Sequence, residues 1–158
     1  AWPTNMTDTA TFPVFKITTP MTKPHKNKTF ATLLATLLGG FGVHRFYLRG
    51  SVDRLGLLHL TSVPIAGMVY GLAPEADWFF KVLPIVVSYC VAFIESLVIG
   101  LTPDEKFDAK FNAGSGQVSS SSWILAVLLV ATMMVGAVTL IGTIARVFDL
   151  LYTGGAYG

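Results

Sequence analysis

The chain has 158 residues, of which 53% are hydrophobic and 13% are charged, and its net charge is +2. Soluble domains carry about 25% charged residues, so this composition argues against an ordinary soluble protein and indicates membrane helices. The small, scattered positive charge argues against a nucleic-acid-binding surface. The single cysteine, Cys90, excludes an intrachain disulfide.

Residues 1–28 contain several prolines and many threonines without helical periodicity, which predicts an extended polar tail. Its lysines gather towards the end of the tail, where basic side chains attract anionic lipid. The tail has no apolar core before a cleavage site, so it does not resemble a secretory signal.

The first apolar segment carries no charge from Thr29 to Val43. As a helix this stretch reaches only about 22 Å, less than the roughly 30 Å of a hydrocarbon core. We therefore predict one continuous membrane helix over 29–48, which brings a charged aromatic turn to the membrane interface. That interfacial turn consists of His44, Arg45, Phe46 and Tyr47.

Small residues of the same helix form two adjacent columns at a spacing of four. Such columns let another backbone approach closely, which is how helices associate in lipid. The predicted helix-packing face consists of Ala31, Ala35, Gly39, Thr32, Thr36 and Gly40. The alternative is that these residues reflect only the general abundance of glycine and alanine in membrane helices.

The stretch KTFATLLATLLGGFGVHRFYL, residues 28–48, resembles the signature of the TM-two domain family. That family is named for two transmembrane helices joined by a short turn with an HRF or DRF triplet. One departure is that the glycine expected after the Tyr-Leu pair is displaced to Gly50. The resemblance implies a small integral membrane protein and implies no reaction, because the family has no agreed activity or catalytic residues.

Two further apolar segments, 55–73 and 78–101, follow the turn, and each contains one proline. With 29–48 they make a TM-two-like membrane domain over 29–101. The stretch AFIESLVIGL, at 92–101, resembles the closing pattern of the family, and Glu95 stands in the place of its acidic residue.

A polar loop and linker, 102–122, combines five clustered charges with a glycine and serine-rich end, which predicts a water-exposed, flexible connection. An additional transmembrane helix is predicted over 123–152. The expected fold is thus all-α: a helical integral membrane protein with about four transmembrane segments, a polar N-terminal tail and a charged loop before the last helix. An even number of segments places both termini on one side, which we expect to be the cytoplasm.

Glu95 lies about six positions from the end of its segment, roughly 9 Å along the helix. An unpaired carboxylate at that depth is costly, so we expect Glu95 to be protonated, to face a polar cavity or to be paired. Arg45, Arg54 and a residue of another subunit are the possible partners. A proton or ion relay and a structural ion pair are both open.

His44 and His59 raise a haem or metal hypothesis, because histidines on separate helices can ligate from two sides. No other Cys, His, Asp or Glu completes a site with recognisable spacing. We therefore expect both histidines to form hydrogen bonds, and we predict no cofactor, no metal and no catalytic residue; the expected bound molecules are lipids.

The favoured hypothesis is a non-catalytic accessory subunit of a multi-subunit membrane complex, such as a respiratory or other energy-transducing assembly. Its expected partners are membrane lipids and other membrane protein subunits, with no nucleic acid and no soluble small-molecule substrate. The alternative is a small homo-oligomeric channel or transporter that uses Glu95 and Arg45. The charged loop favours a bacterial inner (cytoplasmic) membrane, with the mitochondrial inner membrane as the alternative.

Overall fold

The structure is a computed structural model that describes residues 23–157. Most of the predicted tail, residues 1–22, therefore lies outside the described residues. Every regular element within 23–157 is helical. In chain order they are α1 (Lys28–Leu38), the 3-10 turn η1 (Gly39–Phe41), α2 (Val43–Arg49), α3 (Arg54–Leu72), α4 (Trp78–Leu101), α5 (Asp104–Phe111) and α6 (Trp123–Thr153).

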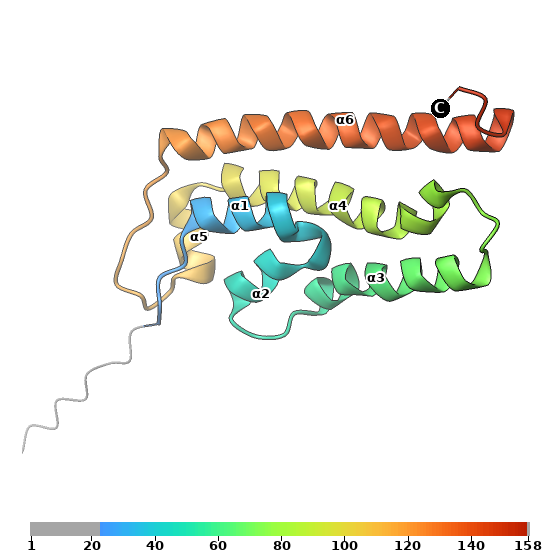
Figure 1. Ribbon diagram of the computed structural model, residues 1–158. Helices are drawn as coiled ribbons and strands as arrows, with labels where there is room; N and C mark the ends of the chain where they lie inside the picture. Colours follow the sequence, from blue (N-terminus) through green and yellow to red (C-terminus); the bar gives the residue numbers. More distant parts are fainter. Residues whose placement is uncertain (1–22, 158) are drawn as a thin grey trace, which may run out of the picture.

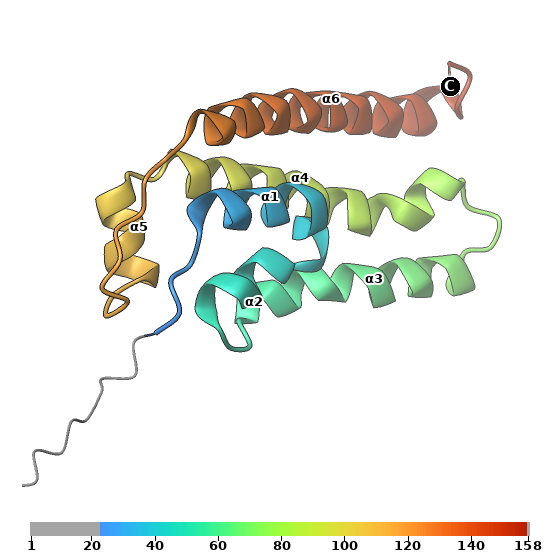
Figure 2. The same cartoon turned by 60° about the vertical axis from the view of Figure 1, so that its left-hand side comes forward.

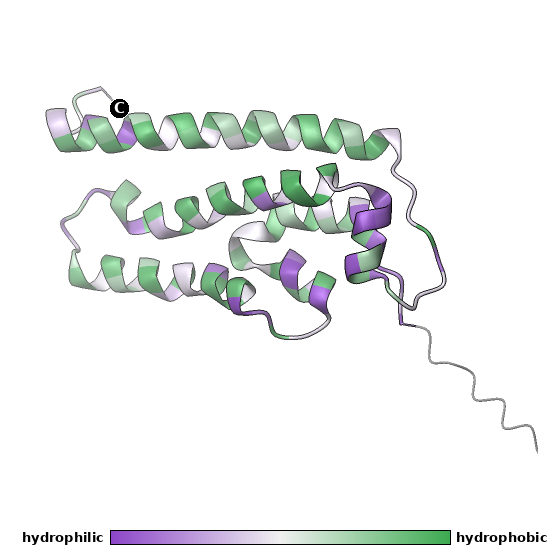
Figure 3. Ribbon diagram, turned by 180° about the vertical axis from the view of Figure 1, so that it is seen from behind, coloured by the Kyte–Doolittle hydropathy of each residue, from purple (hydrophilic) through white to green (hydrophobic). Residues whose placement is uncertain are grey.

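Three long helices, α3, α4 and α6, lie side by side with their axes roughly aligned (Figures 1 and 2). They contain 19, 24 and 31 residues, and each is long and apolar enough to cross a membrane. Hydrophobic residues cover most of their length, and polar residues gather near helix ends, on α2 and around α5 (Figure 3). The prediction of an all-helical membrane protein is confirmed.

The predicted continuous helix over 29–48 is wrong. Helix α1 ends at Leu38, the chain tightens into η1, and α2 runs back beside α1 (Figure 1). Gly42 has φ of 74° and is the left-handed residue at which the direction changes. The glycine-rich stretch favours this break, since glycine is a poor helix former. The described part of the chain has three candidate spans, and the fourth predicted span is not confirmed.

The bent pair α1–α2 changes the expected topology. The start of α1, the connection from α2 to α3, and α5 all lie at one end of the long helices. The connection from α3 to α4 and the C-terminal residues lie at the other end (Figure 1). Three spans would place residue 23 and residue 157 on opposite sides of the membrane, whereas the predicted common side for the termini requires an even number of spans.

The region predicted as a flexible connection, 102–122, contains helix α5 and is held in place by carboxylates. Asp108 accepts a hydrogen bond of 2.6 Å from the Ser119 amide, and Asp104 accepts one of 2.8 Å from the Ser121 amide. Lys28 at the start of α1 forms an ion pair with Asp104 and donates to the Thr102 carbonyl at 2.9 Å. We call residues 23–28 together with 102–122 the polar cap.

Candidate functional site

Two glycines dock the reversal at η1 and α2 against α3. A Cβ on Gly42 would lie 2.4 Å from the carbonyl oxygen of Gly56, and a Cβ on Gly56 would lie 2.8 Å from the ring of Phe46. Gly42 therefore requires glycine, because the Gly56 backbone lies too close for a side chain, and at Gly56 the Phe46 ring occupies the space that a side chain would need. This close contact fixes α2 so that His44 and Arg45 face the interior of the helix bundle.

The interior side chain that α2 meets is Glu95 of α4. His44 Nε2 lies 2.7 Å from Glu95 Oε2, and His59 Nε2 from α3 lies 3.2 Å from the same oxygen. Arg45 Nε lies 3.0 Å from each carboxylate oxygen, and Arg45 Nη2 forms a further ion pair with Oε1. Nitrogen atoms from two helices thus surround the Glu95 carboxylate, which supplies the pairing that a carboxylate at this depth requires.

Arg45 extends this network to Asp53 at the start of α3. Its Nη1 lies 3.2 Å from Asp53 Oδ2, and Arg49 Nε lies 3.1 Å from Asp53 Oδ1. Asp53 also caps α3 by accepting a 3.2 Å hydrogen bond from the Gly56 amide. Burial raises the pKa of Asp53, but the Gly56 amide and the two guanidinium groups outweigh it and hold that pKa below its ordinary value.

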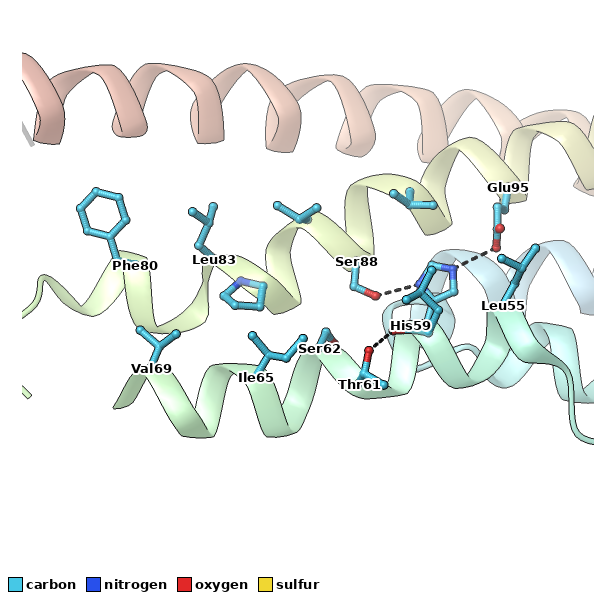
Figure 4. A pocket seen from close by; sticks show the side chains of 14 residues that line it. Leu55, His59, Thr61, Ser62, Ile65, Val69, Phe80, Leu83, Ser88 and Glu95 are labelled. Atoms are coloured by element: carbon cyan, nitrogen blue, oxygen red, sulfur yellow. Dashed lines mark hydrogen bonds and ion pairs between the residues drawn. The ribbon is translucent and has the colours of Figure 1, made fainter. Parts of the chain in front are cut away.

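His59 links the network to the 3-10 turn. Ser88 Oγ lies 2.7 Å from the Gly40 carbonyl oxygen and 2.7 Å from His59 Nδ1. The Ser88 hydroxyl has one hydrogen, which it donates to the carbonyl, so His59 Nδ1 is the donor in the second bond. His59 Nε2 then forms a full hydrogen bond to Glu95 only when both imidazole nitrogens carry hydrogen. Figure 4 shows this row of side chains between α3 and α4.

His44 makes one polar contact among the described residues. Its side chain is almost fully buried, its Nε2 atom faces Glu95, and its Nδ1 atom has no hydrogen-bond partner in that part of the chain. Hydrogen on Nε2 fits this arrangement, because an ionised carboxylate oxygen can only accept. The rings of His44 and His59 meet edge to face, with centroids 5.9 Å apart.

The predicted packing face is covered within the chain itself. Ala31, Ala35 and Thr32 have no exposed surface, and Gly39 and Gly40 are buried. A Cβ on Gly39 would lie 2.6 Å from Ala92 Cβ, and one on Gly40 would lie 2.4 Å from the Tyr89 ring. The glycines therefore allow η1 to approach α4 closely, as expected for small residues at a helix contact in lipid.

Thr36, the last residue of that face, joins three helices through its hydroxyl group. Its Oγ1 atom lies 2.8 Å from Ser96 Oγ on α4 and 2.8 Å from Thr132 Oγ1 on α6. Ser96 in turn donates a 3.0 Å hydrogen bond to the Thr32 carbonyl. Hydrogen bonds of this kind hold α1, α4 and α6 together where hydrocarbon provides no hydrophobic drive.

The four residues of the predicted interfacial turn separate into two pairs. His44 and Arg45 belong to the Glu95 network. The Phe46 ring packs on Gly56 instead. The Tyr47 hydroxyl accepts a 3.0 Å hydrogen bond from the Asn27 amide, which ties α2 to the polar cap.

The sequence did not single out Asp53, although an Asp three residues before Gly56 and just ahead of an apolar run is a recognisable helix cap. Ser88 gave no signal beyond being polar. Within residues 23–157 no group of three or more His, Cys, Asp and Glu side chains is placed to hold a metal ion. The arrangement neutralises a buried carboxylate and positions helices, and the Ser88 hydroxyl beside His59 donates its hydrogen to the Gly40 carbonyl.

Comparison with known proteins relates one part of the chain to a family. Residues 24–72 match the TM2 domain, which confirms the resemblance found at the HRF turn. The match covers α1, η1, α2 and α3 and ends before α4, so Glu95 lies outside it. No curated protein and no solved structure matches the chain.

Proposed function

We propose that this chain, which matches the TM2 domain over residues 24–72, is a non-catalytic accessory subunit of a larger membrane protein complex. It acts by helix packing and assembly, and its partners are membrane lipids and other membrane subunits. We place it in a bacterial inner membrane, with the mitochondrial inner membrane as the alternative. Energy-transducing assemblies are the favoured hosts, by analogy alone.

The observation that carries this proposal is an unfilled pair of glycines on α3. Gly67 and Gly71 are spaced four residues apart and exposed, and nothing lies within 4 Å of a Cβ at either position. Two glycines at this spacing form a notch that admits a neighbouring helix backbone. The small-residue face of α1 and η1 is already covered by α4, so the notch on α3 is the face for a second protein.

The state of Glu95 supports a structural role over the alternative of a channel or transporter. His44, His59 and Arg45 together direct their nitrogen atoms at its two oxygens, whereas an ion path requires a group that can exchange partners. If Glu95 lined a path in a homo-oligomer, Glu95→Gln would abolish flux in proteoliposomes. We expect no flux from the unsubstituted chain.

The test is extraction of the tagged full-length chain in mild detergent, followed by mass spectrometry. We expect other membrane proteins to co-purify at fixed stoichiometry with the unsubstituted chain and to be lost from the double variant Gly67→Leu/Gly71→Leu. Gly142→Leu is the matched control, because Gly142 on α6 also has open space around it but no small residue four positions away. Recovery as a monomer or homo-oligomer alone would refute the proposal, as would retention of the partners by the double variant.

A further inference from the structure

A long groove lies between α3 and α4, with a volume of about 700 Å³. Side chains from both helices line it (Figure 4). On α3 the lining extends from Leu55 to Val69, which is about 21 Å at the helical rise. The groove therefore runs along most of the α3–α4 pair, inside the region that hydrocarbon surrounds.

The size of the groove suits a small molecule such as a single hydrocarbon chain. Its volume of about 700 Å³ falls within the range of about 300 to 1,000 Å³ that is usual for small-molecule sites.

The polarity of the groove restricts the occupant further. Apolar side chains line most of its length, and the ionisable groups at one end, His59 and Glu95, already pair with each other. Ser62 is different: its side chain is 5% exposed, and its hydroxyl has no hydrogen-bond partner among the described residues. The carbonyl of Leu58, one turn earlier, instead accepts from Thr61.

The position of Ser62 along α3 also indicates how deep in the membrane a polar atom of the occupant would lie. Ser62 lies about 12 Å along α3 from Arg54, which is below the level of phospholipid headgroups. A buried hydroxyl without a partner is costly, so an oxygen atom at this depth would stabilise it. Ser62 is one of the residues that line the groove.

We propose that the groove binds one neutral lipid. Its extended hydrocarbon chain lies along α3 and α4, and a single hydroxyl or carbonyl oxygen within that chain hydrogen-bonds with Ser62. A charged headgroup does not fit inside, because the carboxylate in the lining is already paired with Arg45. The site is independent of the glycine notch, since Gly67 lies about 200° around α3 from the groove residue Ile65.

The test uses the purified full-length chain in phosphatidylcholine nanodiscs. The probes are methyl stearate and its derivative with one hydroxyl in the middle of the chain, and bound molecules are counted by native mass spectrometry. We expect saturation at one molecule per chain, with the hydroxylated probe preferred several-fold. Binding that rises without saturation, or equal binding of both probes, would overturn the proposal.

Three variants locate the site. Ile65→Trp fills the groove and is expected to reduce binding of both probes several-fold, whereas Met68→Trp, on an exposed part of α3 outside the lining, leaves it unchanged. Ser62→Ala should retain binding and lose the preference for the hydroxylated probe. Equal effects of the two tryptophan variants, or a preference that survives Ser62→Ala, would contradict this assignment.

A final experiment separates a lipid from a protein occupant in cells. A photo-crosslinking amino acid at Val87, a half-exposed residue of the α4 lining, is expected to yield an adduct with the mass of one lipid. An adduct with a second copy of the chain or with another protein would overturn the proposal.

Discussion

Arg45 is the residue on which the buried charges depend. It joins Glu95 inside the bundle to Asp53 at the start of α3, and its side chain is 20% exposed. Without this cation, Glu95 would keep only His44 and His59 as partners, and the one cation left beside Asp53 would be Arg49 among the described residues. Since the ion pair is largely enclosed, loss of one partner is costly, whereas replacement of both by neutral groups is tolerated better.

We therefore predict that Arg45→Gln destabilises the protein by about 3 kcal/mol. Unfolding of the purified chain in mixed micelles measures this change. The double variant Arg45→Gln/Glu95→Gln should be destabilised by less than the sum of the single variants. Arg54→Gln is the matched control, because Arg54 is exposed and forms no ion pair among residues 23–157. Strict additivity of the two single variants would show that the network carries no coupling.

Pairing was one of three states expected for Glu95 from its depth in an apolar segment, and Arg45 was among the three possible partners. The convergence of His44 and His59 on the same carboxylate was not expected, because the continuous helix predicted over 29–48 would have placed His44 at the membrane interface. The error came from a length argument that assumed a straight helix. An uncharged stretch can also turn back within the membrane, as α1 does at η1, and it then does not need to be long enough to cross the hydrocarbon core.

At the scale of elements, the reversal at η1 is the feature that distinguishes α1 and α2 from a membrane-spanning helix. Gly42→Ala places a side chain on a left-handed residue, which costs about 1 to 2 kcal/mol before any clash with Gly56. We predict a loss of stability of at least this size in micelle unfolding. Gly67→Ala, in open space within α3, should instead be neutral or gain up to about 1 kcal/mol of helix propensity.

The polar cap yields a prediction about pH. Hydrogen bonds from the Ser119 amide and hydroxyl and from Asn112 lower the pKa of Asp108 to about 2. A pKa that is lower in the folded state contributes stability above the ordinary value of 3.8, and this contribution is lost as pH falls towards 2. The Ser119 amide signal in NMR spectra should therefore titrate near pH 2, and Asp108→Asn should remove that transition. A midpoint near 3.8 would show that the contact does not persist in solution.

The contribution of Asp104 to stability should also be lost as pH falls. Its ion pair with Lys28 and its hydrogen bonds from Ser121 hold its pKa below the ordinary value. These bonds explain why the segment predicted as a flexible linker is ordered: its serines are partners of two aspartates on α5. Composition alone indicated a loop, because the serine-rich pattern does not reveal which carboxylates the serines meet.

For the whole molecule, the number of spans decides how the chain lies in the membrane. We predict that Lys23→Cys and Tyr157→Cys, each in a Cys90→Ala background, react with a membrane-impermeant maleimide from opposite sides of the membrane. Both positions are exposed, and the start of α1 and the C-terminal residues lie at opposite ends of the long helices. Reaction of both from one side would mean an even number of spans, as in the predicted arrangement with a membrane helix over 29–48.

The sequence was sufficient for the helical class, for the helices over 55–73, 78–101 and 123–152, and for the family match at the HRF turn. Those features depend on local composition and length. The groove between α3 and α4 and the cover of the α1 face by α4 depend on how distant helices pack, which no local pattern specifies. Whether other subunits cover the remaining faces stays a prediction.

The distance along the chain between Arg45 and Glu95 bears on biogenesis. Glu95 follows Arg45 by 50 residues, and at roughly 5 to 20 residues per second the ribosome needs several seconds to reach it. Throughout that interval the guanidinium has Asp53 but not its deeper counterion. Burial of Arg45 in the bilayer is therefore fully compensated only after α4 has been synthesised. The α1–α2 pair, although made early, is expected to reach its final position late.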